Sequence, residues 1–321
     1  MDRRDELQLF PLIKGAATYV PGLYRPERGS TGGTVTARYC YSVWLRHLRT
    51  ISAASGQSSF ARVAELGPGD SLGIGLAALL SGASHLEALD VVRYAPRERN
   101  RAILLELAAL FRKKERIPDD SEFPRVQPKL RVYDFPSDLL DGGRLANALS
   151  EARVARIGAA VDGMPSDVSA EYRVPWDQGS VKAEADQDLV YSQAVLEHVE
   201  DINATHSALA RRLRPGGIAS HAVDFRSHCI TPGWDGHLQY SPGLWRIVKG
   251  RRPYLLNRRS PTEHLTAMER TGFRILREDR ITQEPTLSDR KLAGTFRSWS
   301  REDRRTAAMT IVARRNTQDA G

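Results

Sequence analysis

The stretch VAELGPGDSLGIGLAALL, residues 63–80, decides the fold of this chain. Its first four residues form a short apolar run typical of a buried strand, and Gly67–Gly69 predicts a tight turn. An apolar helical stretch then begins at Leu72, and a second apolar segment, HLEALD, ends in Asp90. The pattern predicts a strand, a glycine turn, a helix and a second strand, which is an arrangement that binds nucleosides.

The glycine spacing narrows the kind of nucleoside ligand. Glycine lets the backbone approach a ligand closely, and we expect free N–H groups in the first turn of the following helix. Asp90 lies about 20 residues beyond the glycines, where a carboxylate would hold a ribose diol. A dinucleotide-binding motif requires G-x-G-x-x-G, whereas Gly67, Gly69 and Gly73 form G-x-G-x-x-x-G. This spacing disfavours an NAD-linked oxidoreductase.

With Glu65 two residues before the first glycine, the turn resembles the first motif of the class I S-adenosylmethionine-dependent methyltransferases, an acidic residue followed by x-G-x-G-x-G. Ser71 stands where that motif has its third glycine, a departure that a tight turn can accommodate. The resemblance implies that S-adenosylmethionine is the cofactor. It also implies that the binding residues of this unit are Glu65, Gly67, Pro68, Gly69, Ser71 and Asp90.

Two later segments resemble further motifs of the same family. DLVYSQAVLEHVED, from Asp188, predicts a strand that runs into a helical segment with apolar spacing at 195, 196 and 199. Gln193 at the end of this strand is expected to line the methyl-transfer site, and His198 is expected to act in the fold or near the cofactor. RRLRPGGIASHAVDF, residues 211–225, predicts a basic helix end, a Pro-Gly-Gly turn and a fifth strand.

The resemblance implies a Rossmann-like seven-stranded α/β sheet, mostly parallel with the last strand antiparallel and with helices on both faces. We expect a helical cap at 1–59, a methyltransferase domain at 60–315 with insertions at 91–170 and 226–259, and a tail at 316–321. Periodicity predicts helices at 37–51, 96–114 and 143–157, and another between Ser260 and Gly272. Strands are expected at 171–174, 272–278 and 307–315.

The turn after the third strand places Trp176 and Asp177 at the carboxyl edge of the sheet, where open α/β sheets bind ligands. In similar methyltransferases, a polar side chain near this point meets the adenine amino group and a flat apolar neighbour covers the ring. The resemblance therefore suggests Asp177 for the first role and Trp176 for the second. A core or lid position is the alternative for Trp176.

The segment 226–259 is rich in groups that handle protons, and it follows the fifth strand at the edge where the acceptor is expected. A hydroxyl acceptor needs a base, for which histidine is the usual choice, so His228 and His237 are the candidate bases. A metal site is an alternative use of this region. Because its spacing matches no compact ligand motif, we expect no metal there, although five residues carry suitable side chains: His221, Asp224, His228, Asp235 and His237.

Composition limits the remaining possibilities. The net charge of +8 invites an RNA-binding hypothesis, but the arginines are mostly interleaved with acidic residues, and SQAV stands where many RNA methyltransferases carry N-P-P-[YF]. Cys40 and Cys229 form no disulfide framework, and neither a signal peptide nor a membrane-spanning run is evident. We therefore expect a cytoplasmic enzyme that methylates a small molecule or glycan, most simply at a hydroxyl. An RNA methyltransferase and a non-catalytic cofactor-binding protein remain alternatives.

Overall fold

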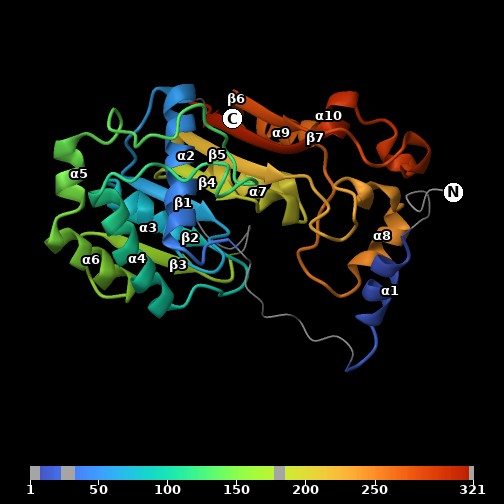
Figure 1. Ribbon diagram of the computed structural model, residues 1–321, viewed down its shortest axis with the longest axis horizontal. Coiled ribbons are helices and arrows are strands. Elements are labelled where there is room, and N and C mark those ends of the chain that lie inside the picture. The colour runs from blue at the N-terminus through green and yellow to red at the C-terminus, as the bar shows by residue number, and fades with distance from the viewer. Residues whose placement is uncertain (1–7, 23–32, 177–184, 318–321) are drawn as a thin grey trace.

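The computed structural model describes residues 8–22, 33–176 and 185–317 (Figure 1). Its centre is a seven-stranded sheet in the order β3-β2-β1-β4-β5-β7-β6, in which β7 runs antiparallel to both of its neighbours. This confirms the predicted Rossmann-like α/β fold. The strands are β1 (Arg62–Leu66), β2 (His85–Leu89), β3 (Ser169–Arg173), β4 (Gln187–Gln193), β5 (Leu213–Asp224), β6 (Phe273–Thr282) and β7 (Thr306–Arg315).

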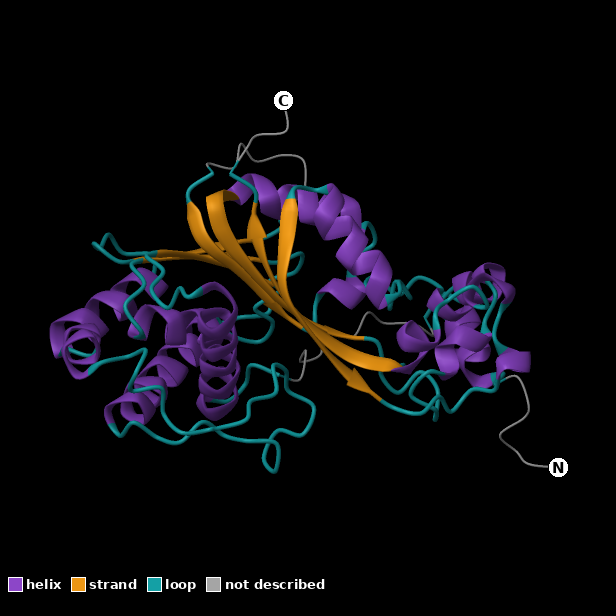
Figure 2. Cartoon of the chain, turned by 90° about the horizontal axis from the view of Figure 1, so that it is seen from above, coloured by secondary structure: helices purple, strands orange, loops and turns teal. Residues whose placement is uncertain are grey.

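Helices cover both faces of the twisted sheet, and a further group lies beyond one end of it (Figures 1 and 2). One face carries α2 (Ala37–Ser55), α3 (Gly73–Leu80), α4 (Arg97–Arg112), α5 (Gly142–Ala148) and α6 (Glu151–Val161). The opposite face carries α7 (Ile202–Arg212) and α9 (Pro261–Arg270). The outlying group contains α1 (Phe10–Ala17), α8 (Pro242–Lys249) and α10 (Arg301–Arg305). Short 3₁₀-helices are η2 (Leu196–His198), η3 (Gly236–Gln239), η4 (Asp289–Lys291) and η5 (Gly294–Phe296).

The α2 helix from the N-terminal region is part of the main core. Thr36 caps its start by accepting a hydrogen bond from the Tyr39 amide, and Gly56 ends it with φ +74°. Trp44, Leu45 and other apolar side chains of α2 are buried against the sheet. The α1 helix instead packs against α8, where a Cβ on Gly15 would lie 2.0 Å from the Ile247 carbonyl oxygen. The proposed division of the chain into cap and catalytic domain stays a prediction.

The single helix predicted at 143–157 is wrong, because the chain forms two helices there. Asp141 caps α5 by accepting a hydrogen bond from the Arg144 amide. The backbone at Ser150 is extended, with φ −57° and ψ 144°, and its hydroxyl donates to the Asn147 carbonyl at 3.1 Å. A serine that satisfies a nearby carbonyl in this way competes with helix continuation, so α6 begins afresh at Glu151.

Two details near β4 and β5 also differ from expectation. The helix predicted from Val195 is only the 3₁₀ turn η2, and α7 starts at Ile202, where Asp201 caps it by accepting from the Ala204 amide. The Pro-Gly-Gly element lies within β5 rather than before it. Leu213 pairs with Gln187 and Ile218 with Leu189, so the residues between them form a bulge with Gly216 at φ +76°.

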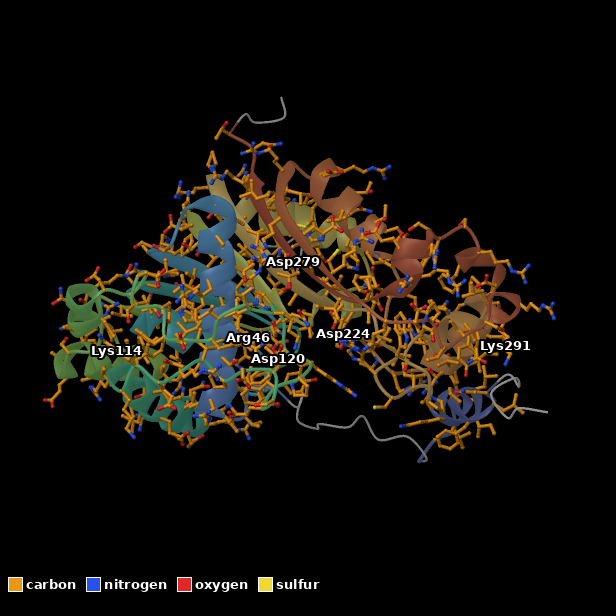
Figure 3. All side chains as sticks on the ribbon, turned by 45° about the horizontal axis from the view of Figure 1, so that its top comes forward. Arg46, Lys114, Asp120, Asp224, Asp279 and Lys291 are labelled. Atoms are coloured by element: carbon orange, nitrogen blue, oxygen red, sulfur yellow. The ribbon has the colours of Figure 1, made fainter. Side chains whose placement is uncertain are left out.

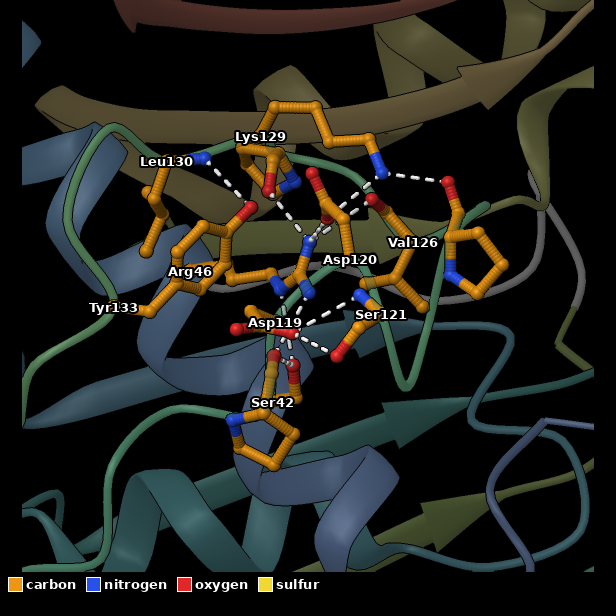
Figure 4. Close-up of polar contacts among 12 residues, drawn as sticks. Ser42, Arg46, Asp119, Asp120, Ser121, Val126, Lys129, Leu130 and Tyr133 are labelled. Carbon is orange, nitrogen blue, oxygen red and sulfur yellow. Dashed lines mark hydrogen bonds and ion pairs between the residues drawn. The ribbon is translucent and has the colours of Figure 1, made fainter.

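The long connection between β2 and β3 is fastened to α2 by Arg46, whose side chain is fully buried (Figure 4). The guanidinium donates to the carbonyl oxygen of Pro118 at 2.8 Å, to Asp120 Oδ1 at 2.9 Å and to the carbonyl oxygen of Val126 at 3.1 Å. It also stacks over the Tyr133 ring at 4.8 Å. The connection is therefore ordered around one planar, multi-donor side chain.

We expect Arg46→Met to lower the free energy of unfolding by about 3 to 5 kcal/mol, because it leaves buried carbonyl groups without a donor. Urea denaturation measures this change. The matched control is Arg49→Met on the same helix, because Arg49 pairs at 3.1 Å with an Asp138 side chain that is 61% exposed. This control should cost about 1 kcal/mol or less, and equal losses in the two variants would contradict the proposed anchoring role.

Of the helices in the described ranges, none is long and apolar enough to cross a membrane.

Candidate active site

The glycine turn after β1 has the conformation that the sequence predicted. Gly67 and Gly69 adopt φ of +69° and +71°, which side-chain-bearing residues rarely tolerate. The Gly67 amide donates to the Leu89 carbonyl at 2.8 Å, which draws the turn toward the end of β2. A Cβ on Gly67 would lie 2.5 Å from a methyl carbon of Val195. Glycine is therefore required here both by the backbone and by packing.

Glu65 lies beneath this turn with 1% of its surface exposed. Its Oε2 atom accepts hydrogen bonds from the Gly75 amide at 3.1 Å and from the Tyr191 hydroxyl at 3.0 Å. Burial raises the pKa of Glu65 to about 8, against the opposing effect of these two donors. The carboxyl group thus ties β1 to the start of α3 and to β4.

The first turn of α3 differs from the prediction, because some of the amides expected to be free already have partners. The Leu72 amide donates to Asn100 Oδ1 at 2.9 Å, and the Gly73 amide donates to Ser71 Oγ at 3.1 Å. Side chains thus satisfy donors that an anion would otherwise use. The expectation of free N–H groups is wrong for these two residues.

Thr34, which the sequence analysis did not identify, holds the glycine turn from the N-terminal side. Its hydroxyl donates to the Pro68 carbonyl at 2.8 Å and accepts from the Ser71 amide at 3.0 Å. The Ser71 hydroxyl donates in return to the Thr34 carbonyl at 2.5 Å. Ser71 at the position of the third motif glycine therefore has a specific function in this chain, which is to attach the segment before α2 to the turn.

Asp90 lies at the carboxyl end of β2 beside the glycine turn. Its Oδ1 accepts from the Val91 amide at 2.7 Å, and Oδ2 accepts a long hydrogen bond of 3.4 Å from the Tyr172 hydroxyl. Burial raises the pKa of Asp90, while the amides of Val91, Val92 and Gly69 favour its charged form. One carboxylate oxygen therefore retains capacity for another donor.

The other predicted cofactor residues lie around the same edge. Trp176 is 7% exposed and packs in the apolar cluster with Leu66 and Leu89, and its indole N–H has no partner in the described part of the chain. Gln193 ends β4, and its Oε1 lies 3.2 Å from His47 Nε2. Asp177 lies outside the described residues.

A second polar group lies at the ends of β4 and β5. His228 Nε2 is 3.6 Å from Asp224 Oδ2 and 3.8 Å from Glu197 Oε1, and the His198 ring packs edge-on against the His228 ring at 5.0 Å. Asp224 lies near the middle of the molecule, between Arg46 on one side and Lys291 on the other (Figure 3). Burial raises the pKa of Glu197 well above its usual range. The side chain of His228 is 30% exposed and thus open to an acceptor.

The other three residues of the predicted histidine and aspartate set are buried and are not exposed to an acceptor. They are His221, Asp235 and His237. Burial lowers the pKa of His237 to about 3, and its ring packs near Trp245. Asp235 accepts from the Leu287 amide at 3.1 Å and is 1% exposed. His221 is fully buried, with Nδ1 2.8 Å from Ser192 Oγ. Of the five residues, Asp224 and His228 therefore lie together, whereas His221, Asp235 and His237 are buried.

Asn257, which the sequence did not single out for the site, fastens segment 226–259 to the turn after β4. Its side-chain amide donates to the carbonyl oxygens of Leu196 and Val199 at 2.7 and 3.0 Å, and its own backbone amide donates to the Glu197 carbonyl at 2.7 Å. His198 Nδ1 lies 2.8 Å from the Tyr254 carbonyl oxygen. No local pattern predicts these contacts, because they join segments about 60 residues apart.

No model of a known protein family matches the chain, and no curated protein matches it in sequence. Solved structures resemble it in fold. An S-adenosylmethionine-dependent methyltransferase from Mesorhizobium loti aligns at 16% identity and a TM-score of 0.43, covering 83% of this chain and 96% of its own. A second such enzyme, from Methanosarcina mazei, aligns at 13% identity and 0.43, covering 82% and 95%.

The sheet order, the antiparallel β7 and the glycine turn together match the predicted architecture. The chain has the class I methyltransferase fold. A phosphoethanolamine N-methyltransferase 2 from Haemonchus contortus, solved with S-adenosyl-L-methionine, aligns at 14% identity and a TM-score of 0.42, covering 88% of this chain and 57% of its own. At such low identities and TM-scores, these likenesses do not indicate an acceptor substrate for this chain.

Proposed function

We propose that this protein transfers a methyl group from S-adenosylmethionine to a hydroxyl of a small molecule or glycan. The observation that carries the proposal is the left-handed Gly67 and Gly69 turn, which lies against Asp90 at the carboxyl edge of the sheet. The polar group around His228 supports it, because it occupies the ends of the next two strands. Ligands bind at this edge in open α/β sheets.

The residues present fit the cofactor. Asp90 Oδ2 has capacity for a ribose hydroxyl, and the backbone of Gly67, Pro68 and Gly69 can approach a ligand because no side chain projects from the two glycines. We infer that Glu65 and Ser71 position this turn from beneath. Further proposed contacts around the adenine and the methyl group involve Trp176, Asp177 and Gln193.

On the acceptor side, we infer that His228 accepts the proton of the substrate hydroxyl. When bound, S-adenosylmethionine supplies a methyl carbon whose bond to sulfur breaks as the acceptor oxygen lone pair forms the new bond. The His228 side chain is partly exposed, and Asp224, 3.6 Å from its Nε2, would stabilise the imidazolium that results. His237 remains a candidate base from the sequence, but its burial and its lowered pKa favour His228 for this role.

With an acceptor in hand, we expect His228→Gln to lower kcat about 100-fold or more while cofactor affinity stays unchanged, because only proton removal is lost. His237→Gln should leave kcat within a few-fold and chiefly change stability. Steady-state kinetics and calorimetry measure the two effects. Loss of turnover in His237→Gln but not in His228→Gln would reverse the assignment.

Calorimetry with S-adenosylmethionine, S-adenosylhomocysteine and NADH tests the proposed function. Binding of the two adenosyl ligands alone is the expected result, followed by turnover in a screen of hydroxyl acceptors. Binding of NADH alone, or of none of the three, would overturn the proposal. Binding without turnover on any acceptor would favour a cofactor-binding protein instead. The cytoplasmic location expected from the sequence stays a prediction.

A further inference from the structure

Three side chains that the fold brings together at the acceptor edge have the chemistry of a metal site. Glu197 and His198 belong to η2 after β4, and His228 follows β5. Their ligand atoms all lie within 4.8 Å of one another, and no other group of this kind is found in the residues that the structure describes. Ligands of one ion at about 2.1 Å lie about 3 to 4 Å apart, so small side-chain rotations close the site.

Glu197 provides the observation that points to a ligand. Its side chain is 4% exposed, and neither carboxylate oxygen has a hydrogen-bond partner in the described part of the protein. Oε1 instead faces His228 Nε2 at 3.8 Å. The backbone amides of Glu197 and Asp224 favour the charged form without forming close hydrogen bonds, so the buried carboxyl group is poorly compensated. A cation between Glu197 and the two histidines would satisfy it.

The two histidines are arranged as ligands usually are. The Nδ1–H of His198 can donate to the Tyr254 carbonyl oxygen at 2.8 Å, which leaves the lone pair of Nε2 free and fixes the ring. This is the usual outer-shell arrangement of a metal-binding histidine. His228, four residues beyond the end of β5, is held in the left-handed region at φ 47°, and its ring packs against that of His198. Asp224 Oδ2, 3.6 Å from His228 Nε2, can supply a fourth ligand.

We propose that Glu197, His198 and His228 bind a divalent transition-metal ion, with Asp224 as an additional ligand. Two imidazoles and a carboxylate favour Mn²⁺, Fe²⁺, Co²⁺ or Zn²⁺ over Mg²⁺, which prefers ligands made of oxygen alone. The partial exposure of His228 leaves room for a substrate oxygen to complete the coordination.

The site itself rests on the contacts above, and its use in catalysis rests on the proposed function. A bound ion would lower the pKa of a coordinated hydroxyl and orient its oxygen toward the methyl group. In that state His228 and Asp224 are ligands, and the proton leaves to solvent. The base role of His228 proposed above therefore belongs to the metal-free protein.

Titration of the full chain, first stripped of metal with a chelator, tests the site without any turnover. Mn²⁺ binding is followed by electron paramagnetic resonance, and Co²⁺ binding by visible absorption. We expect one equivalent of either ion to bind, and His228→Ala and Glu197→Gln each to weaken binding more than about 100-fold, beyond the usual effect of an outer-shell change. Circular dichroism confirms that each variant is folded.

Two matched controls accompany these variants. Cys229→Ala removes the exposed thiol next to His228, and Glu200→Gln removes an exposed carboxylate that pairs with Lys249 at 2.6 Å. Both should bind the ion as the unaltered protein does. The proposal would be overturned if the unaltered protein bound no ion at millimolar Mn²⁺ or Co²⁺. It would also be overturned if His228→Ala and Glu197→Gln bound the ion as tightly as the unaltered protein does. Calorimetry with S-adenosylmethionine on the metal-free chain reports separately on the proposed function.

Discussion

Lowering the pH from 7.5 to 5 will destabilise this protein strongly, because several histidines are buried in their neutral form. Three of them form a cluster between β5 and the helices α7 and α9, with the ring of His206 at 5.8 Å from that of His221 and at 6.5 Å from that of His264. In the described part of the chain, neither nitrogen of His206 or His264 has a hydrogen-bond partner. Nothing in the cluster compensates a positive charge.

Burial is the main cause of the lowered pKa of these groups. It lowers the pKa of His206 to about 4 and that of His264 to about 3, and it lowers the pKa of His221 well below the usual value. His47 on α2 and His237 are also buried, with pKa values of about 4 and about 3. Protonating any of them requires a charge in an apolar interior.

The direction in which the stability changes with pH follows from the difference in proton binding between the unfolded and folded chains. The unfolded chain takes up protons near pH 6.5, whereas the folded chain does not until the lowered pKa is reached, so this stability is present above pH 6.5 and is lost as the pH falls toward about 4. Each such histidine should contribute about 2 kcal/mol of loss at pH 5. Glu65, with its pKa raised to about 8, acts in the opposite direction, because its stabilising contribution is lost as the pH rises.

Urea denaturation at pH 7.5 and pH 5 measures the loss. The variant with His206→Met and His264→Met isolates the cluster, since the contribution of Glu65 is common to both proteins. We expect the variant to lose about 4 kcal/mol less than the unaltered chain between the two pH values. An identical pH dependence in the two proteins would show that the cluster is charged or hydrated at neutral pH.

Asp90→Ala should raise the Kd for S-adenosylmethionine at least 30-fold, which corresponds to about 2 kcal/mol or more. The carboxylate stands next to the glycine turn with one oxygen able to accept a further hydrogen bond, and alanine offers no acceptor. Calorimetry measures the affinity. Because Oδ1 also bonds the Val91 amide, the thermal stability of the variant is measured alongside.

The matched control for this substitution is Asp167→Ala. Asp167 precedes β3, and thus lies at the amino edge of the parallel sheet, where it pairs with Arg156 at 2.9 Å and is 64% exposed. Its loss should leave the Kd unchanged. If Asp90→Ala binds S-adenosylmethionine as well as Asp167→Ala does, the cofactor site is not at the end of β2.

Local sequence patterns were sufficient to predict the parts of the fold that depend on short segments alone. The tight turn at Gly67–Gly69, the helix from Arg97 to Arg112 and the helix α9 after Ser260 all agree with expectation. Predictions failed where a side chain competes with regular structure over a few residues. The break at Ser150 is of this kind, and the bulge around Gly216 is a backbone irregularity of similar length; periodicity is too coarse to locate either.

The sequence by itself determined the order of strands and helices, the glycine turn and the residue types available at each strand end, because these depend on neighbours within a few positions. Only the tertiary structure decided which of those side chains meet. It seated Thr34 on the glycine turn, buried His237 and placed His228 beside Glu197. Such contacts join residues that are distant along the chain, and their geometry depends on how whole elements pack, so no local pattern encodes them.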